Sequence, residues 1–412
     1  MIKKIRVEQL EKGMYIHDMN CGWMQHPFVR NRFLVTHDEA ITKVMDLGVQ
    51  ELYIDSEKGD DVPDAPTEAE VASDLQRRMK EAALRTTSPA PTVELREEIE
   101  QAKEIHTEAV QTVLNVMQNA RMGKHVEVER VEPLVQKITE SIFRNPDAML
   151  IMSKVKRKDT YTFHHSVSVC ALLISFLRSQ GSDLDKIREI GIGGLLHDIG
   201  KMMIPEYILL KAGPLTGPEF DTMKMHVELG VKLLEKNLRI SRTALVMVYQ
   251  HHEHYDGSGY PGHLCGEKIS LYGQIASIVD VYDAMTSDRV YRKAMDPTMG
   301  LRKLYEWSKY HFNEELVEYF VRSIGIYPVG TLVRLESGRL AVVIDRGSGT
   351  LLRPVLCVVY DKKRGGRLEP QRLDLSKPET FAERIVGTES PFPYDIDPLQ
   401  YISGTPSISD LL

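Results

Sequence analysis

The chain has 412 residues, a formal net charge of −7 and an isoelectric point near 6.1. This length favours two or three domains over one compact core, and the acidic balance argues against a general nucleic-acid binder or a protein of the membrane surface. We find no apolar stretch near the roughly 18 residues of a membrane span, and no apolar signal region at the N-terminus. Four scattered cysteines show neither disulfide nor metal spacing, which is typical of a reducing cytoplasm (Cys21, Cys170, Cys265 and Cys357).

Residues 1–58 are expected to form a small α/β domain. Short apolar runs predict strands at 14–16, 33–35 and 51–54. A helix between the last two strands is predicted to begin at Thr36 or Asp38 and to end at Gly48. The histidines of this segment lack ligand spacing, so we expect no site among them (His17, His26 and His37).

Residues 59–92 are expected to be a linker, because Asp, Pro, Ala, Glu, Ser and Thr dominate there; it contains one predicted helix near 68–85. Residues 93–147 are expected to hold connector helices, at about 93–122 and 131–143. This pair of helices either transmits a signal or dimerises the chain, or it only packs domains together. The sequence leaves these alternatives open.

Residues 148–324 read as an almost wholly helical domain, and residues 325–412 as a small β module with an irregular tail. Eight of the fourteen histidines lie between positions 164 and 263. Beyond Gly325, alternating or apolar runs between turns predict strands at 331–335, 340–344 and 355–360. We therefore expect a multidomain protein in which an all-α catalytic domain follows an α/β domain and precedes the β module.

Five helical segments of the catalytic domain each carry residues of the metal-ligand type. His197 and Asp198 end an apolar helix, and Gly200 is expected to let the backbone turn sharply after them. Another segment begins with a capping box at Thr216–Glu219. The candidate ligands are His165, His197, Asp198, His226, His251, His252 and Asp280, with Asp283 one turn beyond the last.

A single histidine on an apolar helix face is more often a hydrogen-bonded core residue than a ligand. An unpaired buried carboxylate, however, costs several kcal/mol, and seven such residues would leave one core full of uncompensated polar groups. Metal ions remove this difficulty. Imidazoles and carboxylates without cysteine favour Fe, Mn or Zn.

Seven ligands exceed the four of one tetrahedral ion. A pair of ions bridged by Asp198 and a hydroxide fits the number better, and two metals about 3.5–4 Å apart are the usual arrangement for hydrolysis of phosphate esters. The loop with Gly259, Tyr260 and Pro261 follows the His251-His252 pair; it is either a substrate-shaping loop or an ordinary surface turn.

Basic residues near these segments could balance an anionic substrate. Lys201 and Lys211 lie in the histidine-rich part of the chain, and Arg289 and Arg292 follow about one helical turn apart. The two arginines could equally be solvated surface charges.

The order and spacing of these candidate residues resemble those of a known protein family. His197-Asp-Ile-Gly-Lys201, His226, His251-His-Glu with Asp256-Gly-Ser-Gly-Tyr-Pro261, and Asp280-Val-Tyr-Asp with Arg289-Val-Tyr-Arg292 are similar to the HD-GYP subgroup of the HD phosphohydrolase superfamily. The resemblance covers about residues 160–320. The N-terminal segment looks like the small domain often fused ahead of bacterial HD-GYP modules.

The resemblance implies a bacterial phosphodiesterase with two divalent transition metal ions, Fe or Mn, which hydrolyses cyclic di-GMP to linear pGpG. It implies metal ligation by the seven residues given above and catalytic roles for Asp198 and Lys201, with Lys201 beside the scissile phosphate. Substrate contacts are implied for Lys201, Asp283, Arg289 and Arg292, and for the loop of Gly259, Tyr260 and Pro261. The implied partners are cyclic di-GMP or a related cyclic dinucleotide, signalling proteins of the diguanylate cyclase type and a second copy of the chain.

One position departs from the family pattern. Some members carry a glutamate one turn before the first histidine, where it supports a third metal, and this chain has Tyr161 there. We therefore expect two metals and a slow second step from pGpG to GMP. Two other functions stay open: a nucleotide phosphohydrolase of the HD type and a non-catalytic sensor of cyclic dinucleotides.

Overall fold

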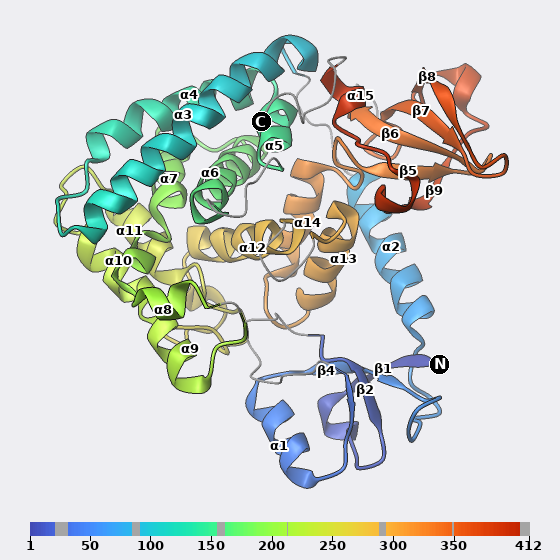
Figure 1. The fold of residues 1–412 in the computed structure, drawn as a ribbon, viewed down its shortest axis with the longest axis horizontal. Helices are drawn as coiled ribbons and strands as arrows, with labels where there is room; N and C mark the ends of the chain where they lie inside the picture. The colour runs from blue at the N-terminus through green and yellow to red at the C-terminus, as the bar shows by residue number, and fades with distance from the viewer. Residues whose placement is uncertain are drawn as a thin grey trace. The chain divides into compact units, whose positions relative to one another are not determined.

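The computed structural model describes residues 1–20, 32–84, 91–154, 161–211, 213–287, 294–347 and 350–403 (Figure 1). The chain divides into two compact units, one of Met1–Arg78 with Ile204–Met225 and one of Met79–Met203 with His226–Leu412. The five predicted segments stay a prediction about domains, because one compact unit can contain several of them. The predicted fold class, a helical domain between an α/β segment and a β module, is confirmed.

The first unit contains a four-stranded antiparallel sheet of order β1-β4-β2-β3. Its core consists of alternate apolar residues such as Ile5, Ile16, Leu52 and Ile54, which are fully or almost fully buried. The bounds of its elements are β1 Ile2–Arg6, β2 Tyr15–Asp18, β3 Phe33–Leu34, α1 Asp38–Asp46 and β4 Glu51–Asp55. The sequence predicted all of these except β1.

Helices account for most of the second unit. Side chains that accept hydrogen bonds from the first free N–H groups fix several of their starts (Asn145, Ser241, Ser270, Asp296 and Asn313). The helices are α3 Leu95–Arg121, α4 Val128–Arg144, α5 Pro146–Met152, α6 Tyr161–Ser179, α7 Leu184–Leu196, α10 His226–Leu234, α11 Arg242–Gln250, α12 Leu271–Thr286, α13 Pro297–Trp307 and α14 Glu314–Ile324. Figure 1 shows α3 and α4, the predicted connector helices, packed side by side.

The predicted helix after the capping box is in fact two helices. The capping box of Thr216 and Glu219 is present and starts α9 (Gly217–Lys224), but that helix ends before Met225. A new helix, α10, begins at His226. Together with α2 (Glu68–Leu84) and α8 (Glu206–Leu209), these complete the helices that precede the C-terminal sheet.

The helices that carry the histidines pack against one another. α6 packs on α7 and α12, α11 packs on α7 and α12, and α10 packs on a short 3-10 helix, Ile199–Met203. Gly200 makes the last of these approaches possible, since a Cβ there would lie 1.9 Å from the backbone oxygen of His226. The glycine is therefore required by a close contact of two backbones, and the sharp turn that we expected does not explain it.

The C-terminal β module is a five-stranded antiparallel sheet of order β8-β7-β6-β5-β9. Leu332, Leu340 and Val342 belong to its own buried cluster. The bounds are β5 Leu332–Leu335, β6 Arg339–Asp345, β7 Val355–Asp361, β8 Gly366–Asp374 and β9 Ile385–Thr388, followed by α15 Gln400–Ser403. Among the helices of the described residues, none is long and apolar enough to cross a membrane.

Candidate metal centre

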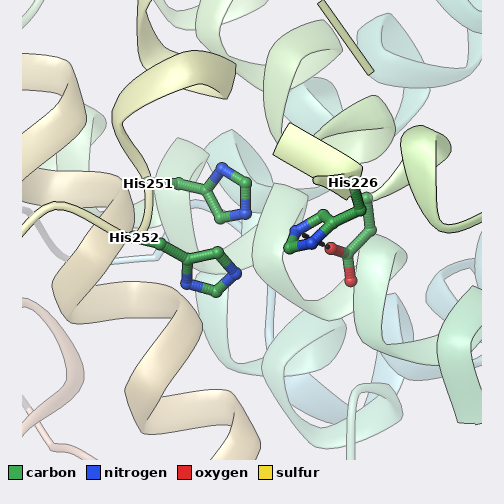
Figure 2. Close-up of side chains that lie close together, drawn as sticks. His226, His251 and His252 are labelled. Atoms are coloured by element: carbon green, nitrogen blue, oxygen red, sulfur yellow. Dashed lines mark ion pairs between the residues drawn. The ribbon is translucent and has the colours of Figure 1, made fainter. Parts of the chain in front are cut away.

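The seven predicted ligands come together in the second unit as two groups of buried or nearly buried side chains. One group consists of Asp198, His226, His251 and His252, and the other of His165, His197 and Asp280. Within each group, one ligand-type atom of every residue lies within 4.8 Å of the corresponding atoms of the others. Figure 2 shows the rings of His251 and His252 facing that of His226 across a common space.

The ends of helices position most of these residues. His197 directly follows α7, His251 directly follows α11, and His226 is the first residue of α10. His165 and Asp280 lie within α6 and α12. Because helix ends converge here, side chains far apart in sequence meet without a long loop.

Asp198 occupies a central position between the two groups. Its Oδ2 lies 3.5 Å from His197 Nε2 and 3.7 Å from His165 Nε2, both of the second group. Its Oδ1 lies 3.4 Å from His226 Nε2 of its own group. One carboxylate thus faces both groups, which is the geometry that a bridging ligand needs.

Backbone carbonyls orient two of the imidazoles. The Nδ1 of His197 lies 2.7 Å from the oxygen of Gly194, and the Nδ1 of His251 lies 2.6 Å from the oxygen of Val248. A carbonyl oxygen only accepts, so Nδ1 carries the hydrogen in both rings and Nε2 keeps its lone pair for a ligand bond.

The buried lone pairs fit a metal. Within the described part of the chain, His197 Nε2, His251 Nε2 and Asp198 Oδ1 are buried and make no hydrogen bond. A buried acceptor without a partner costs about 1–3 kcal/mol, and more when it is charged. Several such atoms turned toward one space are explained by cations that satisfy them together, and the nitrogen and oxygen donor set fits a divalent transition metal.

The protonation states also suit metal binding. Burial, followed by the charge of neighbouring imidazoles, lowers the pKa of His251 to about 3 and that of His252 well below its usual range. Burial alone would raise the pKa of Asp198, but the Lys201 ammonium holds it well below its ordinary value. These two histidines are therefore neutral and Asp198 is ionised near neutral pH, as ligands must be.

The predicted substrate residues differ in where the structure places them. Lys201 points to the centre, with its Nζ 2.6 Å from Asp198 Oδ2. Asp283 is buried and contacts His165, whose Nδ1 lies 2.7 Å from Asp283 Oδ2. Arg289 and Arg292 lie outside the described residues. Lys211, the further cation, pairs with Glu219.

The loop of Gly259, Tyr260 and Pro261 folds back on the histidine pair. The backbone N–H of Tyr260 donates to the oxygen of His252 at 3.0 Å, and the centroids of their rings are 4.7 Å apart. Burial raises the pKa of the Tyr260 hydroxyl well above its usual value, so the hydroxyl stays protonated. The loop therefore belongs to the wall of the centre.

Glu253 is a residue whose role the sequence did not reveal. It is buried, and its carboxylate accepts the backbone N–H groups of Gly262 at 2.6 Å and of Leu264 at 2.9 Å. An acidic residue between a ligand pair and a glycine-rich loop was the available signal. Tyr161, where some family members have a glutamate, stacks on His165 with 5.8 Å between the ring centroids.

Comparisons with known proteins agree with this arrangement. A family model described as an HD domain matches residues 148–316, and one described as a domain of unknown function matches residues 2–131. A cyclic di-GMP phosphodiesterase of Pseudomonas aeruginosa is 38% identical over 394 residues, which cover 94% of this chain and 92% of that protein.

Two further similarities are more limited. A 3'3'-cGAMP-specific phosphodiesterase of Vibrio cholerae is 40% identical over 124 residues, or 30% of this chain and 24% of that protein. A solved structure of an HD-GYP-type protein from Bdellovibrio bacteriovorus covers 78% of this chain and 98% of its own, at 18% identity and a TM-score of 0.46. The relative that spans nearly the whole chain and the HD-domain match across the ligand-bearing helices lead to one conclusion: the chain belongs to the HD-GYP family of HD-domain proteins.

Proposed function

We propose that this protein is a metal-dependent phosphodiesterase that hydrolyses cyclic di-GMP to linear pGpG. The observation that carries the proposal is the meeting of seven imidazole and carboxylate side chains in two adjoining groups. The relative that shares 38% identity over 94% of the chain is a cyclic di-GMP phosphodiesterase, which supports the same substrate. The reaction adds water across one phosphodiester bond and opens the ring of the dinucleotide.

The seven side chains would hold two divalent ions. Asp198, which faces both groups, would bridge them, with His226, His251 and His252 on one side and His165, His197 and Asp280 on the other. When bound, such ions supply an acidified water and positive charge for the phosphoryl oxygens. We propose Fe or Mn, the metals that the family resemblance implies and that a set of nitrogen and oxygen donors can hold.

Residues around the ions would bind and orient the substrate. The Lys201 ammonium lies 2.6 Å from Asp198 and is partly exposed, so it can reach a phosphate oxygen while it stays beside the centre. The protonated Tyr260 hydroxyl can donate a hydrogen bond. We also propose that Arg289 and Arg292 contact the anionic dinucleotide.

The direct test is a product assay with the metal-loaded, full-length protein under reducing, oxygen-free conditions. Chromatography should show cyclic di-GMP converted to pGpG, with slow formation of GMP. A panel with cyclic GMP-AMP and mononucleotides separates this function from a broader phosphohydrolase activity. Tight binding of cyclic di-GMP without any product would overturn the proposal in favour of a non-catalytic sensor.

Asp198 provides a sharper test. Asp198→Ala should remove the bridge and lower turnover by more than about 10²-fold, since such ligands act as a unit. Asp185→Asn is a matched control, because Asp185 is on α7 of the same segment and its side chain is exposed. Full activity of the Asp198→Ala protein would contradict the assignment.

The cytoplasmic location, a diguanylate cyclase-type partner and a homodimer stay predictions.

A further inference from the structure

We propose that Asp283 is a positioning residue for His165, whose imidazole it holds through Nδ1, and that it is not a contact of the substrate. The proposal rests on the proposed function and departs from what the family resemblance implies for Asp283. The observation that carries it is the distance of 2.7 Å between His165 Nδ1 and Asp283 Oδ2. Both residues are buried and they are 118 positions apart in the chain.

The contact fixes the tautomer of the ring. An ionised carboxylate can only accept a hydrogen bond, so the Nδ1 of His165 must carry the hydrogen. The lone pair is then on Nε2, which lies 2.9 Å from Asp280 Oδ1 and 3.7 Å from Asp198 Oδ2. Acceptor atoms this close are stable only with a proton or a cation between them. With Nδ1 committed to Asp283, Nε2 is prepared for a cation.

The register of α12 explains why two aspartates serve one histidine. Residues three apart on a helix lie on the same face, and Asp280 and Asp283 are separated by this interval on α12. α12 packs against α6, which carries His165. One turn of α12 therefore places a carboxylate at each of the two ring nitrogens: Asp280 at Nε2 and Asp283 at Nδ1.

The surroundings of Asp283 do not suit a dinucleotide. Asp283 as a whole is 4% exposed. It borders a cavity of about 50 Å³ that Ser153, Thr286 and Ser287 also line. A cavity of this size holds a few water molecules, given the roughly 10–15 Å³ that each requires. Asp283 Oδ2 also accepts the Ser287 hydroxyl at 3.4 Å. The carboxylate is thus engaged within the protein, behind the ring.

Loss of this carboxylate should act first on the metal. Without it, the imidazole can rotate, or take the tautomer with the hydrogen on Nε2, and either change removes a ligand. Partners that orient a metal-binding histidine typically contribute about 10- to 100-fold to metal affinity. A substrate contact, by contrast, would change KM and leave metal binding untouched.

The experiment measures Mn²⁺ binding to the full-length, metal-stripped protein by calorimetry, with no nucleotide present. Asp283→Ala should bind Mn²⁺ roughly 10- to 100-fold more weakly, and Asp283→Asn should be intermediate, since its amide oxygen can still accept from Nδ1. Thr286→Ala is the matched control, because it borders the same cavity and its hydroxyl donates only to the backbone of Tyr282. It should bind Mn²⁺ like the unmodified protein.

A second measurement, steady-state hydrolysis of cyclic di-GMP at saturating Mn²⁺, separates the two roles. Excess Mn²⁺ should restore much of the kcat of both variants with little change in KM. Mn²⁺ affinity equal to that of the unmodified protein, together with a raised KM, would overturn the proposal; Asp283→Asn decides alone if Asp283→Ala does not fold. Because the Mn²⁺ titration uses no substrate, it remains decisive even if the protein does not hydrolyse cyclic di-GMP.

Discussion

The carboxylate of Glu253 accepts the backbone N–H of Gly262 at 2.6 Å, nine positions further along the chain. Its second oxygen accepts the N–H of Leu264 at 2.9 Å, and its own carbonyl accepts the hydroxyl of Ser277 on α12 at 3.1 Å. One buried residue thus joins the histidine pair, the loop that follows it and α12. These hydrogen bonds hold the loop against the metal centre.

This relationship predicts the effect of losing the Glu253 carboxylate. Glu253→Ala removes the acceptor of two backbone N–H groups that are only partly shielded from water, and because water can replace part of these bonds it should lower the free energy of unfolding by about 1–3 kcal/mol. Turnover of cyclic di-GMP should fall as Tyr260 loses its place beside His252. Glu253→Gln, which can accept only one of the two N–H groups, should be intermediate.

Glu267→Gln serves as the control for both measurements, because Glu267 is exposed and, among the described residues, accepts the hydroxyl of Tyr255 alone. Urea unfolding and steady-state kinetics check the prediction. A Glu253→Ala protein with unchanged stability and unchanged kinetics would show that the loop does not depend on the hydrogen bonds of the Glu253 carboxylate.

The backbone around Gly259 leaves no space for a side chain. A Cβ at this position would lie 2.3 Å from the backbone nitrogen of His254 and 2.5 Å from the oxygen of His252. Gly259→Ala must therefore displace the loop, and a displacement of about 1 Å can cost on the order of 10²-fold in kcat/KM. Gly217→Ala, where a Cβ meets nothing within 4 Å, is the control. Equal kcat/KM for the two variants would contradict the close approach.

Tyr161 provides a prediction of gained function. It lies four residues before His165 on α6 and therefore on the same helix face. Tyr161→Glu should add a carboxylate beside His165, raise the metal content from two to three ions per chain and speed the conversion of pGpG to GMP. Tyr161→Phe should keep two ions. Metal analysis with product chromatography checks this, and two ions with unchanged products in the glutamate variant would refute it.

A pH dependence of stability follows from Glu219. The Lys211 ammonium, and then the backbone N–H of Thr216, lower the pKa of Glu219 to about 2 from an ordinary value of 4.5. The unfolded chain therefore binds more protons between these two values, so this contribution to stability is complete above about pH 4.5 and disappears as the pH falls through 2.

The measurement compares the urea midpoint of the unmodified protein with that of Glu219→Gln at several pH values. The variant should have the lower midpoint at pH 7, and the difference should narrow steadily below pH 4.5. A difference that stays constant down to pH 3 would contradict the role of the Lys211–Glu219 pair.

The candidate site could be predicted from the sequence to the extent that helix register determines it. His165 and Asp280 interrupt apolar helical faces, and His197 and His251 end them, so each could be recognised within its own segment. The contact between His165 and Asp283 could not, because it joins residues 118 positions apart and depends on how α6 packs on α12. Family resemblance assigned Asp283 to the substrate, and only the three-dimensional arrangement points elsewhere.

Two of the strands that the sequence did not predict, β1 and β8, have physical explanations. β1 contains Lys3 and Lys4, and the ammonium of buried Lys3 binds Asp61 at 2.8 Å and the carbonyls of Val62 and Pro63 at 3.1 Å, partners that local pattern does not reveal. β8 is a largely exposed edge strand with Pro370 in its middle, so it lacks the apolar alternation that signals a strand. Gly200 was recognised as unusual, but its cause is a contact with α10 that does not exist until the chain folds.

The central claim is that seven side chains from five helical segments hold two metal ions. The most direct measurement is the metal content of the full-length protein, purified without oxygen and analysed by plasma mass spectrometry beside Asp198→Ala. We predict two Fe or Mn ions per chain in the unmodified protein and fewer than one in the variant. A well-folded protein that retains no transition metal, or a variant that retains both ions, would contradict the account.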